Sequence, residues 1–283
     1  MEKLNIVDGY IDKISIVGDM KRDGNIPIPL KFLGNSLDPR IRGPYLVNKG
    51  NYSRNVDFVT VDSTAKIEMN DRKVDVSDFR IDFNPAKCSE DDMKFIYHLL
   101  SMVKNKRCTG IDLCINFHEY IMDYELVDRR QRQERTYKGA GGRLETLYRG
   151  AERSDNYIKF YNKKVQQKDV KYRDIEHEWC RLEETIQGKK AENFHEWEWF
   201  KDIKLVNGNP IFPEDISPID ELVIEGILAK PEKMDKLKPT HKKKIKKLMQ
   251  ELKYPDEFDV YEEIKKTDIV SEATSVIKKL LSS

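Results

Sequence analysis

The chain has 283 residues, 36% of them charged and 39% hydrophobic, and its formal net charge of +1 gives no global basic signal. Its 13 tyrosines and 11 phenylalanines argue against disorder and for a folded core, in one large domain or a domain with an appendage. The four cysteines show no CxxC spacing, no apolar run approaches the roughly 18 residues of a membrane span, and the N-terminus lacks a signal-peptide pattern. We therefore expect a soluble, cytoplasmic protein with no zinc site, no disulfide framework and no membrane partner.

Strands are predicted where apolar and polar residues alternate, because successive side chains of a strand point to opposite faces. In residues 78–84, for example, the apolar side chains face one way, and Arg80, Asp82 and Asn84 face the other. The alternation predicts strands, in chain order, at residues 11–17, 57–68, 78–84, 111–118, 143–148, 157–161 and 179–186. A short polar loop between the fifth and sixth of these strands predicts an antiparallel hairpin.

Helices are predicted from caps and apolar stripes. Ser89 precedes three acidic residues and an apolar stripe at helical spacing, so a helix should begin there. From about Pro213 the strand pattern disappears. Helices are predicted there at residues 219–228, 240–252 and 260–281, with a proline-bounded loop at residues 231–239.

These elements predict an α+β fold. We expect a largely antiparallel central sheet with helices on one face and an open face on the other. This sheet would form a domain over residues 1–212, followed by a helical C-terminal region over residues 213–283.

Polar residues of three predicted strands fall on the open face if the apolar residues pack on the helices. They are Asp112 and Asn116 from one strand, Glu183 from a second and Tyr161 from a third. Oxygen ligands of this kind suit Mg²⁺ or Mn²⁺. Such an ion would polarise a phosphate oxygen while the tyrosine attacks phosphorus.

The ligand set is open at this stage. Glu145, whose facing is ambiguous, and His118, at the end of its strand, are the other candidate ligands. The alternative is an ordinary exposed sheet face, in which Asp112 or Glu183 pairs with Arg181.

Tyr161 ends its predicted strand and is followed closely by Lys163 and Lys164. A phenol hydroxyl can attack a phosphodiester, and nearby cations favour its ionised form and neutralise charge growing on phosphorus. The alternative is an edge-strand tyrosine with lysine flanks. Tyr157, on the same predicted face, and Tyr148, on the neighbouring strand, are rival nucleophiles.

A second signal is a lysine-rich segment at the start of the helix predicted at residues 240–252. Lysines there oppose the helix dipole, which favours a functional reason for them, and their contacts with phosphates would give salt-dependent DNA affinity. No aromatic residues interleave with the lysines, so duplex DNA is favoured over a single strand. The alternatives are a solvated basic helix and a membrane-surface patch.

Several segments resemble the Rep-trans family, the initiator proteins of small rolling-circle plasmids of staphylococci and related Gram-positive bacteria. The core motif falls on residues 145–150, 153–155 and 157–164, and further similarity lies at residues 80–85, 110–113, 116–117 and 181–183. With the lysine-rich helix, the resemblance covers roughly residues 10–255 with gaps. Conjugative relaxases and some phage proteins share the tyrosine motif.

The resemblance implies an HUH-endonuclease-like fold and a metal-dependent endonuclease and strand transferase that starts rolling-circle replication at the plasmid double-strand origin. The nucleophile falls on Tyr161, which would become joined to the 5′-phosphate and release a 3′-hydroxyl. The metal ligands fall on Asp112 and Glu183, and less securely on Glu145. Asn116 stands where family members usually have an aspartate.

The resemblance further implies a homodimer and a host helicase as partners. Lys163, Lys164, Arg149 and Arg153 are candidates for holding the scissile strand. Residues 232–247 match the family's origin-recognition region. Besides Lys233, this segment contains the candidate DNA-binding lysines Lys236, Lys238, Lys242, Lys243, Lys244, Lys246 and Lys247. The alternatives are a relaxase of a conjugative element and a non-catalytic origin-binding regulator.

Overall fold

The computed structural model describes residues 4–46, 52–70, 77–128, 130, 133–139, 141–171 and 174–283. Within these residues, one large sheet has the strand order β10-β11-β12-β13-β8-β1-β7-β6-β5-β4. Each neighbouring pair in this sheet is antiparallel. The prediction of a largely antiparallel central sheet is therefore confirmed.

The strands of the main sheet are β1 (Asp8–Met20), β4 (Ile41–Leu46), β5 (Arg54–Val59), β6 (Thr64–Met69), β7 (Phe79–Phe83), β8 (Val103–Phe117), β10 (Glu134–Lys138), β11 (Leu144–Arg149), β12 (Asn156–Asn162) and β13 (Cys180–Gln187). The hairpin predicted from the polar loop is the β11–β12 pair. The single strand predicted at residues 57–68 was wrong, because a turn at residues 60–63 divides it into the antiparallel strands β5 and β6.

The smaller sheets comprise β15-β14-β9, formed by β9 (Glu125–Asp128), β14 (Ile203–Asn207) and β15 (Asp256–Asp259), and the pair β2 (Arg22–Asp23) and β3 (Ile26–Pro27). The expectation that strands end near Pro213 was therefore wrong. β15 is only four residues long and pairs with β14, so its sequence carries too few alternations to predict it.

The helices are α1 (Ile28–Asn35), α2 (Glu90–Ser101), α3 (Lys163–Lys171), α4 (Lys189–Glu192), α5 (Pro218–Ala229), α6 (Pro239–Glu251), α7 (Val260–Ile264) and α8 (Ile269–Ser282), with 3₁₀ turns η1 (Pro85–Lys87), η2 (Phe194–Glu196) and η3 (Pro231–Lys236). α2 begins as predicted, since Ser89 and Asp92 form a reciprocal capping box. The loop predicted at residues 231–239 contains η3.

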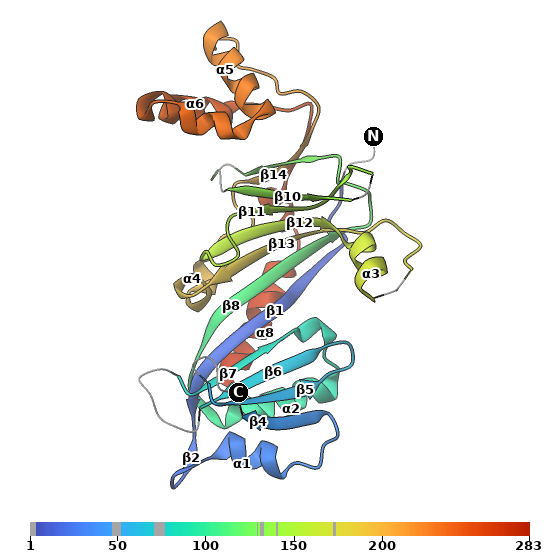
Figure 1. Ribbon diagram of the computed structural model, residues 1–283, viewed down its shortest axis with the longest axis vertical. Helices are drawn as coiled ribbons and strands as arrows, with labels where there is room; N and C mark the ends of the chain where they lie inside the picture. Colours follow the sequence, from blue (N-terminus) through green and yellow to red (C-terminus); the bar gives the residue numbers. More distant parts are fainter. Residues whose placement is uncertain are drawn as a thin grey trace.

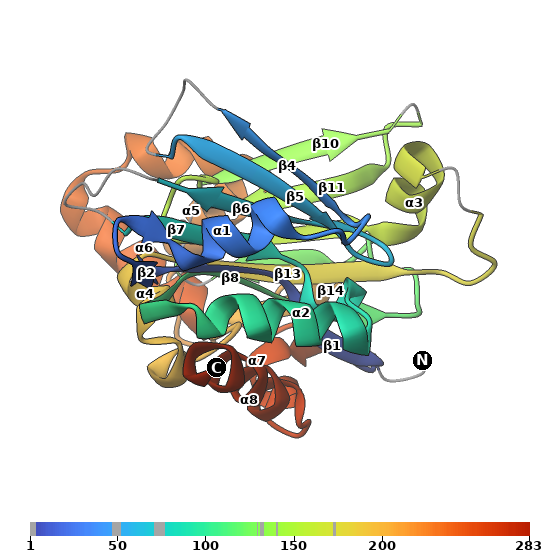
Figure 2. The same cartoon turned by 90° about the horizontal axis from the view of Figure 1, so that it is seen from below.

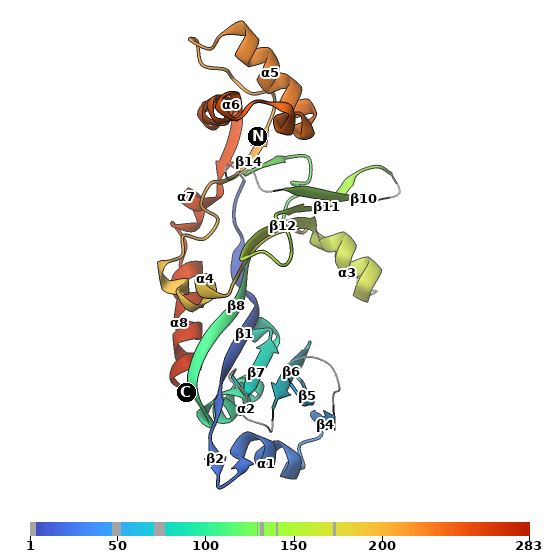
Figure 3. The same cartoon turned by 60° about the vertical axis from the view of Figure 1, so that its left-hand side comes forward.

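One face of the main sheet carries the hydrophobic core. α2 buries Ile96, Leu99 and Leu100, and α8 buries Ile277 and Leu280, all in one cluster with the apolar residues of the strands. α8 packs on β1 and β8, and α2 packs on β8 and α8. In Figure 3, α7, α8 and α4 lie on one side of the long strands β1 and β8, whereas α3 projects from the other side. The open face predicted from the sequence is this second side.

The molecule is elongated along β1 and β8. Figure 1 shows β10–β13 toward one end of these strands and β4–β7 toward the other, with both sets belonging to the same twisted sheet. Figure 2 shows α2 and α8 on the same side of that sheet. Among the described residues, no helix is long and apolar enough to cross a membrane.

The region at residues 213–283 has two parts. α5, η3 and α6 enclose a small core of their own, made by Ile224, Ile227, Met234, Ile245 and Leu252. This helical module lies beyond β14 at one end of the molecule (Figure 1). α7 and α8 return to the main sheet and contribute to its core.

Candidate functional site

The register of the sheet places the predicted site residues on one face. Tyr161 of β12 is opposite Arg181 of β13, and Arg181 is opposite Asn116 of β8. Glu183 lies two residues further along β13 and Asp112 four residues back along β8, on the same face as Tyr161 and Asn116. Directly opposed residues share a face, so all four predicted side chains belong to the open side.

Tyr161 is held between a carboxylate and an ammonium group. Its hydroxyl donates a hydrogen bond to Oε1 of Glu183, and Nζ of Lys163 donates to the hydroxyl oxygen over 3.1 Å. The side chain is only 2% exposed, and burial together with the Glu183 carboxylate raises the pKa of the phenol. The ammonium of Lys159 lies 4.7 Å from the ring centre. The tyrosine is therefore fixed in position and surrounded by charge.

Lys163 contacts the tyrosine and does not lie on the surface. Lys163 is 8% exposed, and its ammonium also donates to Oε1 of Gln166 over 2.7 Å. Burial and the nearby Arg181 guanidinium lower the pKa of Lys163 to about 8. Lys164 differs, because its ammonium pairs with Glu178 at 2.9 Å.

Glu183 is buried among cations. One of its oxygens accepts from Tyr161 and lies 3.6 Å from the Arg181 guanidinium, and the other accepts from Lys159 over 2.9 Å. Glu183 is 4% exposed. These contacts hold the carboxylate in one orientation against the phenol.

Arg181 is the buried centre of the network and was predicted only as an alternative partner for the acids. It is 1% exposed and donates to Oδ1 of Asn116 over 2.8 Å and to Oδ1 of Asp12 over 3.0 Å, and also to the Tyr10 hydroxyl. Its guanidinium carbon lies 5.1 Å from the Tyr10 ring centre and 5.4 Å from that of Trp179. Two aromatic rings and three acceptors thus fix this cation.

The first strand supplies residues that sequence reasoning missed. Besides its contact with Arg181, Asp12 accepts from the amide of Asn84 over 3.1 Å. The Oδ1 atom of Asn84 is buried and has no hydrogen-bond partner among the described residues. Alternation within residues 11–17 predicted the strand, but nothing in the sequence showed that β1 lies between β8 and β7. That position brings Asp12 to the site.

Asp112 lies on the open face close to Glu183. Burial and the Glu183 carboxylate raise the pKa of Asp112 from 3.8 to about 6, against a hydrogen bond from Thr185 that lowers it. The carboxylate form is therefore unfavourable in the folded protein, and this cost appears as the pH rises from about 4 to 6.

Asp112→Asn should consequently stabilise the protein in EDTA at pH 7, by about 3 kcal/mol in the free energy of unfolding. At pH 3.5 both proteins carry a neutral side chain at this position, so the difference should vanish. Urea unfolding at the two pH values measures it. Equal stability at pH 7 would contradict the raised pKa.

Glu145 is not brought to this site. Thr146 is the residue of β11 opposite Tyr161, so alternation turns Glu145 to the other face. Its carboxylate lies against Gly139, in the turn that connects β10 with β11. His118 is exposed beyond the end of β8, where its ring centre lies 4.5 Å from that of His177.

The two candidate arginines differ in position. Arg149 is opposite Ile158 and points away from Tyr161, pairing with Glu134 at 2.7 Å and donating to the carbonyl of Leu126. Arg153 is exposed in the turn between β11 and β12.

The rival tyrosines lie near Tyr161 but have other surroundings. Tyr157 is half-buried on the same face, beside Thr185. Tyr148 is opposite Lys159, and its ring lies beside Arg135 and Tyr137. Among the described hydrogen bonds, neither hydroxyl receives one from an ammonium group, which distinguishes both from Tyr161.

The lysines of the helical module differ in how they are paired. Lys242 contacts Asp235 at 2.6 Å, Lys244 contacts Asp220 at 2.5 Å, and Lys247 lies 3.9 Å from Glu251. The exposed residues of the outer stripe of α6 are Thr240, Lys243, Lys244 and Lys247, while Lys246 is half-buried and Lys236 and Lys238 precede the helix on the surface. The first turn of α6 has no acidic residue and no side-chain cap. Its N-terminal amides are therefore open to an anion.

No group of three or more acidic, histidine or cysteine side chains is arranged to hold a metal ion in the described part of the chain.

Comparison with known proteins gives a consistent set of relatives. The chain is 26% identical over 255 residues to a replication initiation protein of Staphylococcus aureus, an alignment that covers 88% of this chain and 77% of the relative. Two further S. aureus proteins of the same name are 28% and 26% identical, over 62% and 57% of their own lengths. No protein-family model matches the chain.

Among solved structures, the chain is similar to the rolling circle replication initiator protein from Geobacillus stearothermophilus. The superposition covers 78% of this chain and 84% of that one, with a TM-score of 0.44 and 17% sequence identity.

Proposed function

We propose that this protein initiates rolling-circle replication of a plasmid by nicking one strand of the double-strand origin and later rejoining DNA. The observation that carries the proposal is Tyr161, whose hydroxyl is held between Glu183 and Lys163 on the open face of the sheet. The staphylococcal relatives named as replication initiation proteins, which align over most of the chain, support this biological setting. The Rep-trans motifs in the sequence point the same way.

In the proposed reaction, Oη of Tyr161 attacks the scissile phosphorus. The O–P bond to tyrosine forms and the bond between phosphorus and the 3′-oxygen breaks. The 3′-oxygen leaves with the bonding electron pair, takes a proton from water and is released as the 3′-hydroxyl primer. The proton of Tyr161 leaves along its existing hydrogen bond toward Glu183. Lys163 and Lys159 lie where they would neutralise charge on the tyrosine oxygen and the phosphate. Rejoining reverses these steps and needs no nucleotide cofactor.

The donor set fits Mg²⁺ or Mn²⁺ in part. Asp112 is half-buried near Glu183 with a raised pKa, and a divalent cation would relieve the repulsion between these carboxylates. Mg²⁺ commonly uses only one or two protein carboxylates together with substrate phosphates, so Asp112 and Glu183 would suffice. When bound, the ion would polarise a phosphate oxygen. Glu145, on the other face, does not fit this set.

Plasmid nicking tests the proposal. Wild-type protein with Mn²⁺ should convert supercoiled plasmid carrying the cognate origin to the open-circular form, and Tyr161→Phe should reduce this rate by at least about 1,000-fold. Tyr157→Phe is the matched control and should nick at near wild-type rate. Origin binding should survive in both variants. Undiminished nicking by Tyr161→Phe would refute the assignment of the nucleophile.

Recognition of the origin is proposed for the helical module. Exposed Lys243 and Lys247 lie on one stripe of α6, above an N-terminus that is open to phosphate. The proposal includes a cytoplasmic homodimer that recruits a host helicase.

Lys243→Gln should weaken duplex binding at all sequences and reduce the salt slope of the binding constant by about 1. Titration of labelled origin duplex at several salt concentrations measures both quantities. Lys31→Gln, on α1, removes the same charge far from this module and serves as the control. An unchanged salt slope for Lys243→Gln would remove this lysine from the interface.

A further inference from the structure

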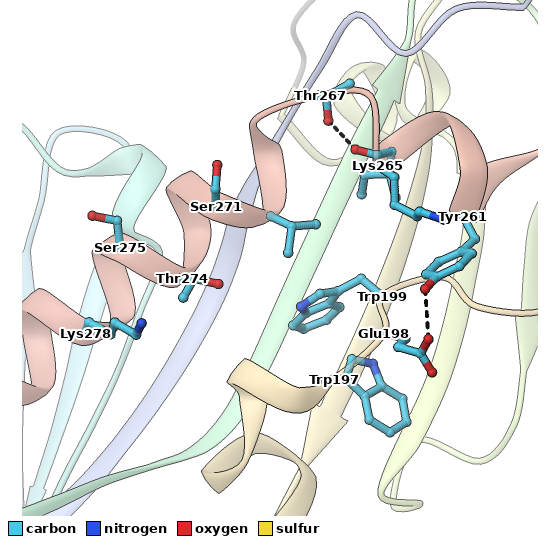
Figure 4. A pocket seen from close by; sticks show the side chains of 12 residues that line it. Trp197, Glu198, Trp199, Tyr261, Lys265, Thr267, Ser271, Thr274, Ser275 and Lys278 are labelled. Atoms are coloured by element: carbon cyan, nitrogen blue, oxygen red, sulfur yellow. Dashed lines mark hydrogen bonds between the residues drawn. The ribbon is translucent and has the colours of Figure 1, made fainter.

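A groove lies on the helix-covered face of the main sheet, opposite the face that carries Tyr161. Its volume is about 710 Å³, and it runs between α7–α8 on one side and residues 197–199 on the other. Figure 4 shows Trp197 and Trp199 on one side and the polar side chains of α8 on the other, with Tyr261 of α7 reaching across to Glu198 at one end.

The aromatic wall is surrounded by cations. The guanidinium of Arg130 lies 5.3 Å from the ring centre of Trp197, and the ammonium of Lys190 lies 5.2 Å from it. Lys265, a lining residue, lies 4.6 Å from the ring centre of Tyr261. The indole nitrogen of Trp197 is buried and finds no hydrogen-bond partner in the described part of the chain. This wall therefore combines aromatic surface with positive charge.

The opposite wall is a stripe of hydrogen-bond donors on α8. Ser271, Thr274, Ser275 and Lys278 follow one another at helical spacing and all line the groove. The Ser271 hydroxyl already donates to the carbonyl of Asp268 over 2.8 Å, so Thr274, Ser275 and Lys278 supply the donors of this wall. From Ser271 to Lys278 the stripe extends about 10 Å at 1.5 Å per residue. This wall includes no acidic side chain, and Lys278 is exposed and forms no ion pair with the described residues. Such a row suits a linear chain of phosphates.

The acidic residue among those lining the groove is Glu198, and it is already neutralised. One of its oxygens accepts from the Tyr261 hydroxyl over 2.8 Å, and the other accepts from Lys201. The ammonium of Lys265 forms an ion pair with the carboxylate of Glu262 at 2.9 Å. The lining thus keeps a positive balance, with Lys278 as its unshared cation.

We propose that this groove binds single-stranded DNA, with bases against Trp197 and Tyr261 and phosphates along the donor stripe of α8. Stacking on aromatic rings beside cations is the sequence-tolerant way in which proteins hold single strands. The length of the stripe favours a strand over a single nucleotide. The inference does not depend on Tyr161, which lies on the other face of the sheet.

Affinity for fluorescein-labelled oligo(dT), measured by anisotropy with the full-length protein, tests the groove. Lys278→Glu and Trp197→Ala should each weaken binding by about tenfold. Lys279→Glu makes the same charge change one residue along α8, where the ammonium lies 4.8 Å from the Tyr97 ring centre. This control should stay within about twofold of wild type. If Trp197→Ala does not fold, Lys278→Glu still tests the groove, because Lys278 is exposed and its replacement should not disturb folding.

Photo-crosslinking locates the strand independently. An oligonucleotide carrying 5-iodouracil should give adducts on Trp197 or Tyr261 in the wild-type protein. Adducts confined to the open face, or equal losses for Lys278→Glu and Lys279→Glu, would overturn the proposal. Displacement of oligo(dT) by an equal nucleotide concentration of dTMP would indicate a mononucleotide pocket instead. A change in sedimentation with Lys278→Glu, without a change in oligo(dT) affinity, would indicate a contact between copies of the chain.

Discussion

Arg181→Met is expected to lower the free energy of unfolding by about 3–5 kcal/mol, because it removes one partner from a buried charged network. Arg181 is 1% exposed and contacts Asp12, Asn116 and Tyr10, and its loss would leave the buried carboxylate of Glu183 with one fewer cation. Urea or guanidinium unfolding at pH 7 measures the change.

Arg107→Met provides the matched control for this loss. Arg107 pairs with Glu192 at 3.2 Å, but half of its side chain is exposed, so the variant should lose less than about 1 kcal/mol. If the two variants lost equal stability, the buried contacts of Arg181 would contribute no more to the free energy of unfolding than an exposed ion pair does.

Lys163→Met is expected to slow nicking by about 100-fold without weakening DNA binding. The sequence had suggested two roles for Lys163, holding the scissile strand and favouring the ionised form of Tyr161. In the structure its ammonium is buried and lies 3.1 Å from the tyrosine oxygen, where it would stabilise charge on the nucleophile. Single-turnover nicking and oligonucleotide affinity separate the two roles.

Lys164→Met is the control for the neighbouring position. Its ammonium pairs with Glu178 and makes no contact with Tyr161 among the described hydrogen bonds, so nicking should fall no more than about threefold. Lys163→Arg should restore part of the rate, because a cation remains near the oxygen. If Lys163→Met lost oligonucleotide affinity while its nicking rate stayed unchanged, Lys163 would act in binding the strand and not in stabilising charge on the nucleophile.

The central sheet could be predicted because its strands obey a period of two. In β12 and β13, Ile158, Phe160 and Leu182 are buried in the core while Tyr161 and Glu183 face the other way, as the alternation predicted. Short or edge strands such as β15 and β10 escaped prediction. β15 has four residues and every residue of β10 is exposed, so neither carries a hydrophobic pattern.

The sequence predicted which face of the sheet carries the site residues, but it did not predict which of these residues contact one another. Alternation places Asp112 and Tyr161 on one side, yet it cannot say which strands are neighbours. The contribution of Asp12 follows from the position of β1 beside β8, a long-range pairing that local sequence does not encode. The facing of Glu145 depends on the register of β11 against β12, which spacing alone left ambiguous.

The burial of the charged side chains at the site could not be predicted from their spacing in the sequence either. Lys163 looks like a surface lysine in sequence, because lysines are rarely buried. Its burial arises from the first turn of α3, which starts directly after β12 and turns the side chain back over Tyr161. Arg181 is buried for a related reason, since Tyr10 of β1 and Trp179, just before β13, enclose it.

Mass spectrometry of the covalent protein–DNA intermediate tests the central claim most directly. The protein would be incubated with Mn²⁺ and an origin oligonucleotide, digested with nuclease and protease, and searched for a peptide carrying a 5′-linked nucleotide. The account predicts the adduct on Tyr161, and its absence from Tyr161→Phe. An adduct on Tyr157 or Tyr148, or DNA cleavage without any protein-linked nucleotide, would contradict it.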